Sequence, residues 1–182
     1  MPLASLFRRN RHRDTALRLY ESIVEQARQP VFFTDFGVPD TFDGRFELVA
    51  LHGFLVLNRL KFQGPKAAEL AQELFDLMFA DFDRSLREMG VGDLGVGRHV
   101  KTMAQGFYGR VGAYEAGLSA DDPAPLAEAL RRNLYGTVSP AEADIDAMAA
   151  YLRHSMQFVA AQPASGLQAG KVVFAAPPCI PQ

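Results

Sequence analysis

Apolar residues recur every three or four positions through most of the chain, the spacing that places them on one face of an α-helix. Glycine and proline interrupt this pattern at intervals, and helix-capping residues precede several of the apolar runs. Runs with the alternation of a β-strand are almost absent. The pattern predicts an all-α, single-domain bundle of about six helices, at residues 14–28, 43–60, 66–89, 97–116, 125–135 and 139–161.

The helix predicted at 43–60 is apolar on most of its faces, which is typical of a helix packed at the centre of a domain. Asp43 is a suitable N-cap residue for it. The last helix is preceded by Ser139, with Glu142 three residues later, the spacing of a capping box. We therefore expect 43–60 to be the most buried element.

Two stretches lack a helical pattern. A loop punctuated by glycine and proline separates the first two helices and carries four phenylalanines, namely Phe32, Phe33, Phe36 and Phe42. The C-terminal end is rich in proline and is expected to be irregular, with one short extended segment at 172–174. The expected organisation is a basic arm (1–13), a helical domain (14–161) and a proline-rich tail (162–182).

Charge is distributed unevenly along the chain. The 182 residues sum to a net charge of −2, which gives no overall attraction to DNA. The arm nevertheless carries four arginines and no acid, so it is a candidate for contact with anionic lipid or with RNA. The residues expected to make these membrane or RNA contacts are Arg8, Arg9, Arg11 and Arg13.

Composition also bounds the compartment. The single cysteine, Cys179, allows no intrachain disulfide, as expected in a reducing compartment. The N-terminus lacks the pattern of a secretory signal, and the longest apolar stretch falls short of the roughly 20 residues needed to span a bilayer. We expect a cytoplasmic protein that is soluble or peripheral on the inner face of the cytoplasmic membrane.

The stretch GVGDLGVGRH, residues 90–99, contains a formal G-x-G-x-x-G. A phosphate cradle of this kind requires a strand before the glycines, whereas a helical pattern precedes them here. We favour a helix that ends at Gly90, followed by a tight connection in which Asp93 is free to cap the next helical turn. The alternative is a nucleotide- or phosphate-binding enzyme that uses this loop with Arg98, His99 and Lys101.

Other candidate chemistry is weaker. The four histidines are widely separated, and His52 lies on the most apolar helix, where a hydrogen-bonded core imidazole is the favoured interpretation. No serine lies in a nucleophile elbow. We therefore expect no catalytic residues, no metal and no cofactor, and a protein that is not an enzyme.

Three glycines, Gly106, Gly109 and Gly112, lie in a helical pattern, where each costs about 1 kcal/mol relative to alanine. Their spacing clears one side of the helix for the close approach of another backbone. That backbone belongs either to the central helix of the same domain or to a partner, and the sequence leaves both open.

The segment LREMGVGDLGVGRHVKTMAQGFYGRVGAYEAGL resembles the ubiquinol–cytochrome c chaperone family, assembly factors of respiratory complex III in α-proteobacteria and mitochondria. The resemblance extends over about residues 14–160 and is carried by G-V-G-D-L together with F-Y-G-R. It implies a helical, non-catalytic chaperone that holds newly made cytochrome b. It also suggests a second assembly factor and the ribosome as partners. Because no long targeting presequence precedes the first helix, we expect a bacterial member.

The resemblance places the family's shared motif on Gly92, Asp93, Leu94, Lys101, Phe107, Tyr108, Gly109, Arg110 and Tyr114. A holder of apolar clients needs an exposed apolar patch with a polar rim, and the aromatic loop and the Phe107/Tyr108 helix are the candidates. An adaptor that binds lipid or the ribosome through the basic arm is a further alternative. The expected client or partner contacts are Phe32, Phe33, Phe36, Asp93, Arg98, Lys101, Phe107, Tyr108, Arg110 and Tyr114.

Overall fold

The computed structural model describes residues 3–177, with side chains for 12–92 and 95–177. The described chain forms one helical domain without a β-strand, which confirms the predicted fold class. Two short helices, α2 and α8, were not predicted. The helices are α1 (Leu3–Ala27), α2 (Val31–Thr34), α3 (Phe42–Leu60), α4 (Pro65–Glu88), α5 (Asp93–Ser119), α6 (Ala124–Asn133), α7 (Glu142–Ala161) and α8 (Ala164–Gln168).

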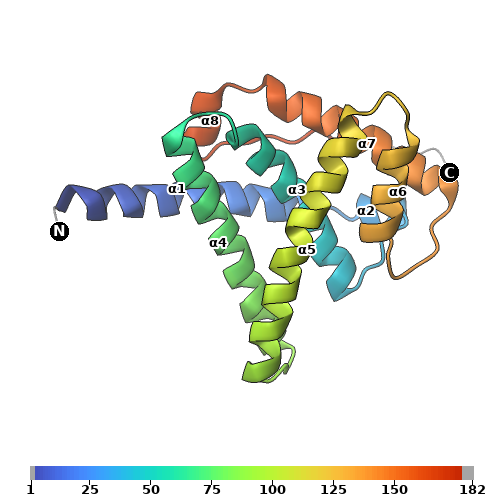
Figure 1. Ribbon diagram of the computed structural model, residues 1–182, viewed down its shortest axis with the longest axis horizontal. Helices are drawn as coiled ribbons and strands as arrows, with labels where there is room; N and C mark the ends of the chain where they lie inside the picture. The colour runs from blue at the N-terminus through green and yellow to red at the C-terminus, as the bar shows by residue number, and fades with distance from the viewer. Residues whose placement is uncertain (1–2, 178–182) are drawn as a thin grey trace.

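Helix α3 is the centre of the domain (Figure 1). Residues 46–56 are buried without interruption, because α1, α4 and α7 all pack against this helix. Its sequence is apolar on most faces, so each neighbouring helix meets apolar side chains. The prediction that this helix is the most buried element is confirmed.

Helix α1 is longer than predicted and begins at Leu3 instead of Asp14. No glycine or proline lies between Leu3 and Ala27, so nothing in the backbone interrupts the helix. Its N-terminal turns project away from the other helices in Figure 1. Arg13 is exposed. The side chains of the other three arm arginines, Arg8, Arg9 and Arg11, lie outside the described residues.

The N-cap of α3 is Thr41, and the expected cap Asp43 was wrong. The Thr41 Oγ1 accepts a hydrogen bond from the Gly44 backbone N–H at 3.2 Å. Threonine has the backbone conformation of a cap at this position, whereas Asp43 is already within the first helical turn. The capping residue therefore lies two positions before the one predicted.

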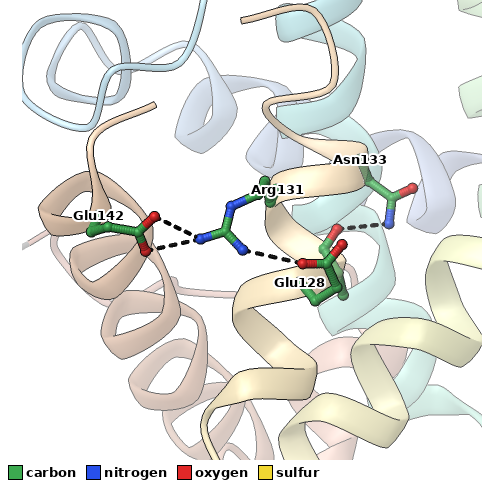
Figure 2. A network of polar contacts seen from close by, with 5 residues as sticks. Glu128, Arg131, Asn133 and Glu142 are labelled. Carbon is green, nitrogen blue, oxygen red and sulfur yellow. Dashed lines mark hydrogen bonds and ion pairs between the residues drawn. The ribbon is translucent and has the colours of Figure 1, made fainter. Parts of the chain in front are cut away.

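The expected capping box at Ser139 and Glu142 was also wrong, because α7 begins only at Glu142. The backbone N–H of Ala141 instead donates to the Asp144 carboxylate at 3.2 Å. Glu142 forms an ion pair with Arg131 of α6, at 2.8 and 2.9 Å (Figure 2). Glu142 therefore joins α6 to α7 instead of closing the first turn of its own helix.

Helices α4 and α5 form a hairpin that projects from the body (Figure 1). Gly90 has a φ of +85°, and the Val91 N–H donates to the Leu86 carbonyl at 3.1 Å, so a left-handed glycine ends α4 as predicted. Helix α5 begins at Asp93 with Gly92 at the N-cap, four residues earlier than expected. The glycine-rich stretch is therefore a tight connection between two helices and the first turns of the second.

The described part of the tail is irregular, as predicted, and residues 172–174 do not pair as a strand. Gln162 holds it against the end of α7: its Nε2 donates to the Val173 carbonyl at 2.6 Å, and its Oε1 accepts from the Val173 N–H at 3.0 Å. Val172 and Ala175 are buried. The C-terminal end, including Cys179, lies outside the described residues.

Candidate functional site

An apolar groove of about 370 Å³ opens where α3, α4 and α5 converge. Small side chains of α4, Ala68 and Ala71, form part of one wall, so the neighbouring helices do not close over the space. The lining residues are Phe54, Leu57, Asn58, Lys61, Ala68, Ala71, Gln72, Phe75, Phe107, Tyr108, Val111 and Glu115.

An aromatic cluster forms the α4–α5 side of the groove. The Phe75 ring stacks on Tyr108 with centroids 5.5 Å apart, and lies 5.7 Å from Phe107 and 4.5 Å from Phe79. Phe107 is 2% exposed, whereas Tyr108 is 63% exposed. The two neighbouring residues predicted from sequence thus both line the groove, Phe107 inside its wall and Tyr108 on its rim.

Polar groups and a further exposed ring lie at one end of the groove. Lys61 Nζ forms an ion pair with Glu115 Oε1 at 2.8 Å, joining α3 to α5 across the opening. Lys61 also lies over the ring of Phe62, 5.5 Å from its centroid. Phe62 is 79% exposed, the highest value among the exposed large apolar residues described. An apolar interior with a polar end suits an amphipathic or apolar helix better than a small polar ligand.

A buried ion pair connects α3 and α5. Arg110 Nε donates to Glu47 Oε2 at 2.7 Å, and the guanidinium makes a second, shorter contact with Oε1. Burial raises the pKa of the Glu47 carboxyl above its usual range, although the ion pair with Arg110 acts in the opposite direction. The guanidinium also lies 5.4 Å from the centroid of the Phe46 ring. Arg110, predicted as a client contact, thus has its partners inside the domain.

Tyr114 lies in the core one helical turn after Arg110. It is 1% exposed, and its ring lies 5.7 Å from that of Phe54. Its hydroxyl has no hydrogen-bond partner among the described residues, and burial raises its pKa. Tyr114 therefore packs α5 against α3 and presents no surface to a partner in this conformation.

The expected open aromatic loop was wrong for Phe32 and Phe36, which are both 0% exposed. Helix α2 and the bend that follows it turn the rings of Phe32 and Phe36 inward, where both lie near Tyr151, with centroid distances of 5.2 and 6.1 Å. Only Phe33 of the predicted three is half-buried, in a separate hollow of about 390 Å³ beside Arg28 and Arg45. A short helix can bury such rings completely, and the sequence pattern of a loop gives no sign of it.

Two predicted basic contacts, Arg98 and Lys101, are exposed on the outer face of α5 and do not line the groove. The side chain of Asp93, also predicted, lies outside the described residues. His52 is a core residue, as predicted: it is 0% exposed and its Nδ1 donates to the Leu48 carbonyl at 2.7 Å. Its Nε2 accepts from the Tyr151 hydroxyl at 2.8 Å.

The glycines of α5 divide into two kinds. A Cβ built on Gly109 or Gly112 would meet no described atom within 4 Å, so packing within the domain does not explain them. A Cβ on Gly117 would lie 2.7 Å from the Leu126 Cα, so this glycine allows the close packing of α5 on α6. Sequence reasoning missed Gly117, because spacing alone does not show which glycine faces a neighbouring helix.

Of the residues that line the groove, sequence reasoning named only Phe107 and Tyr108 as contacts, and it missed Phe75, the residue of α4 that joins them in the aromatic cluster. Phe75, Phe79 and Phe82 follow one another at four and three residues along α4. That spacing marks a second apolar stripe beside the Leu70 and Leu74 stripe that packs on the body. A helix with so wide an apolar surface must pack against neighbours on two sides. The width of this surface could therefore have identified Phe75 from the sequence.

Fold and groove together define an all-α protein with an apolar groove between three of its helices. No helix within residues 3–177 has both the length and the hydropathy required to cross a bilayer. The sequence matches the family of the ubiquinol–cytochrome c chaperone over residues 34–174. The chain belongs to this family, which confirms the resemblance seen in the sequence.

The chain is similar in sequence to two named mitochondrial or complex assembly proteins. The chain is 29% identical over 144 residues to ubiquinol–cytochrome c reductase complex assembly factor 1 of Mus musculus. It is 31% identical over 108 residues to Protein CBP3, mitochondrial, of Saccharomyces cerevisiae. These alignments cover 79% and 58% of this chain, but 48% of the mouse protein and 32% of the yeast protein. The chain thus spans about half the length of the mouse relative and about a third of the length of the yeast relative.

A solved structure is similar over nearly the whole chain. The crystal structure of the Cbp3 homolog from Brucella abortus superposes with a TM-score of 0.83 at 41% sequence identity. The match covers 96% of this chain and 97% of that chain. The two chains therefore share the architecture of the helical domain.

Proposed function

We propose that this protein is a non-catalytic assembly chaperone of respiratory complex III, and that it binds newly made cytochrome b in the groove between α3, α4 and α5. The observation that carries the proposal is the groove itself, with its aromatic wall and the exposed ring of Tyr108 on its rim; the exposed ring of Phe62 lies next to Lys61, which lines the groove. Membership of the chaperone family and the names of the relatives support the connection to complex III.

The groove has the chemistry expected for a membrane-protein client. A membrane helix outside the bilayer exposes apolar side chains on every face, and covering one face removes part of that area from water. Phe107 and Phe75 offer an aromatic surface inside the groove, while Tyr108 is at the rim, where its hydroxyl stays in water. The ion pair between Lys61 and Glu115 is at one end, where a client chain would leave the groove for solvent.

The other proposed partners rest on separate observations. A second assembly factor and the ribosome come from the family resemblance. Peripheral contact with the inner face of the cytoplasmic membrane comes from the basic arm, with Arg13 exposed. All of these fit a cytoplasmic protein that meets its client during or after synthesis.

Site-specific cross-linking tests the groove directly. A photoreactive amino acid at Tyr108 or Phe62 should cross-link to cytochrome b during its synthesis, because both side chains reach into solvent beside the groove. The matched control is Val138, which is 43% exposed in the connection between α6 and α7. Equal cross-linking at Val138 and Tyr108 would contradict a role of the groove.

A gene deletion tests the function independently of the site. In the deletion strain, assembled complex III and membrane cytochrome b should both fall, and the full chain should restore them. Normal levels of both in the deletion strain would overturn the proposed function.

A further inference from the structure

The basic arm has the sequence of an amphipathic helix, and its backbone is helical from Leu3 onward. Leu3, Leu6 and Phe7 have the spacing that places residues on one face of a helix. Because the side chains of residues 3–11 lie outside the described residues, this face is assigned from spacing along the described backbone. Four arginines and no acidic residue follow within 8–13. A helix of this kind is stabilised when its apolar face is covered by a partner surface.

The arm cannot reach the groove of its own chain while α1 stays helical. No glycine or proline interrupts α1, which packs on α3 and α4. At 1.5 Å per residue, Leu3 lies about 18 Å along the axis from Thr15, the first buried residue of α1 among those whose side chains are described. In Figure 1 this end of α1 points away from α5. A surface that covers the arm therefore belongs to another molecule.

The groove between α3, α4 and α5 accepts side chains from one face of a helix. Its volume is about 370 Å³, whereas one turn of an α-helix with its side chains occupies about 420 Å³ or more, from a diameter of at least 10 Å. Its wall is apolar, with Ala71, Phe75 and Phe107. A few large apolar side chains at helical spacing, such as those of the arm, suit this opening.

Carboxylates border the groove on two sides. Glu69 and Asp76 are exposed on α4 and lie seven residues apart, so they share one line of the helix, beside the lining residue Gln72. Gln72 Nε2 donates to Asp76 Oδ1 at 2.8 Å. Glu115 lies on the α5 side, paired with Lys61, which is the one basic residue that lines the groove. These surroundings favour a cationic partner.

We propose that the basic arm of one copy of this chain binds in the groove of a second copy. The apolar face of the arm covers the aromatic wall, and its arginines meet the carboxylates of Glu69 and Asp76. The two surfaces differ, so a closed dimer forms only where both arms are exchanged. The contact itself needs no client. If the groove also holds cytochrome b, as proposed above, the arm competes with the client for it.

Sedimentation velocity of the full chain over a range of concentrations tests the contact without client or lipid. The wild type should self-associate, more weakly as salt is added. Leu6→Glu with Phe7→Glu removes the apolar face of the arm, and Ala68→Arg places a cation in the groove. Each change should weaken the association about tenfold. The matched control is Ala80→Arg, on an exposed position of α4 that does not line the groove, and it should associate like the wild type.

Two charge-reversal variants give the decisive readout. Variant one, Arg8→Glu with Arg11→Glu, has an acidified arm, and variant two, Glu69→Lys with Asp76→Lys, has a basic groove rim. Each should self-associate about tenfold more weakly than the wild type, because like charges then meet. A mixture of the two should associate more tightly than either variant by itself. In the mixture the acidified arm meets the basic rim, and the unchanged arm of variant two meets the unchanged rim of variant one.

An anionic membrane is the competing partner for the arm, because lipid headgroups also attract arginine. If variant one binds anionic vesicles more weakly than the wild type but sediments like it, the arm serves a membrane and the proposal is overturned. A wild-type chain that stays monomeric, or a mixture no tighter than its components, also overturns it. Since no client is present in these measurements, their outcome is independent of the deletion test of the proposed function.

Discussion

Arg110 Nε lies 2.7 Å from Glu47 Oε2, and this ion pair joins α5 to the central helix α3. The Glu47 side chain is 7% exposed and that of Arg110 is 21% exposed. The carboxylate therefore depends on Arg110 for its charge compensation, whereas Arg110 keeps some contact with water. This asymmetry predicts different effects for removing each partner.

Arg110→Met should lower the free energy of unfolding by about 3 kcal/mol at pH 7, because it leaves a buried carboxylate unpaired. The loss should shrink as the pH falls, since burial already raises the pKa of Glu47 and protonation removes the unpaired charge. Replacing both residues, as Glu47→Leu with Arg110→Met, should cost less than Arg110→Met alone. Urea unfolding at pH 7 and pH 5 measures all of these quantities.

The control for this prediction is the exposed ion pair between the same two helices. Glu115→Gln removes the partner of Lys61, but the two side chains are 33% and 50% exposed. Its cost should stay below about 1 kcal/mol, because water solvates the remaining charge. Similar costs for Glu115→Gln and Arg110→Met would show that burial of Glu47 has no special effect.

Two glycines of α5 should respond to the same substitution with opposite signs. Gly112→Ala should raise the free energy of unfolding by about 1 kcal/mol, because the position is open and alanine favours helix. Gly117→Ala should lower it by about 1 to 2 kcal/mol, because the new Cβ would lie 2.7 Å from the Leu126 Cα. Urea unfolding of both variants at low protein concentration gives the comparison, and equal signs would contradict the packing of α5 on α6.

His52 should make the fold sensitive to mild acid. Burial lowers its pKa from 6.5 to about 4, because the folded protein holds the neutral imidazole between Leu48 and Tyr151. The unfolded chain binds a proton near pH 6.5 and the folded chain does not. The stability contributed by His52 is therefore complete above about pH 6.5 and is lost as the pH falls toward 4, by about 3 kcal/mol in total.

Unfolding of the wild type and of His52→Gln across this pH range measures that loss, since the variant should lose about 3 kcal/mol less. The two proteins are compared by their pH slopes, so a lower starting stability of the variant does not affect the result. An NMR titration that finds the imidazole of the folded wild type half-protonated near pH 6.5 would contradict the burial of His52.

Tyr108→Asp should weaken client binding with only a small loss of stability. The side chain is 63% exposed at the groove rim, so its replacement should lower the free energy of unfolding by about 1 kcal/mol, mainly through the lost stacking on Phe75. Assembled complex III in a complemented deletion strain should nevertheless fall, because a charge now lies beside the apolar groove. Phe158→Asp on α7, at 40% exposure, is the matched control and should restore wild-type levels.

Removal of residues 1–13 tests the predicted role of the basic arm. The truncated chain should still fold, because Thr15 is the first buried residue of α1 among those whose side chains are described, from residue 12 on. Its association with vesicles that contain anionic lipid, or with ribosomes, should fall below that of the full chain, which itself should weaken steeply with salt. Neutral vesicles serve as the control. If the truncated chain associates with vesicles and with ribosomes as well as the full chain does, the predicted role of the arm is wrong.

Local chemistry allowed most helices to be predicted. Gly90 ends α4 because only glycine accepts its positive φ at low cost, and Gly64 with Pro65 begins the same helix. Helix ends without such a signal were placed less well. Helix α5 begins at Asp93, four residues before the predicted start at 97. Gly95 and Gly97 lie within its first turns and do not interrupt the helix. Glycine marks a helix end only where the backbone requires its conformational freedom.

The candidate site was only partly predictable. The sequence singled out Phe107 and Tyr108, and the structure places them in one groove wall with Phe75, which sequence reasoning had missed. Phe32 and Phe36 were predicted to be exposed contacts on the same grounds, but both lie in the core. An aromatic side chain in a loop can be buried or exposed, and its neighbours in the sequence do not show which. The outcome depends on the elements that pack against it.

By itself the sequence determined the helical class, the central position of α3, the glycine that ends α4 and the buried role of His52, because each follows from residues within a few turns of one another. Only the tertiary structure decided which aromatic rings stay exposed, which glycine of α5 meets a neighbouring helix, and that Arg110 turns inward to Glu47. Those outcomes depend on side chains brought from distant parts of the chain. Burial is a property of the surface that packs opposite a residue, and the linear pattern does not contain that surface.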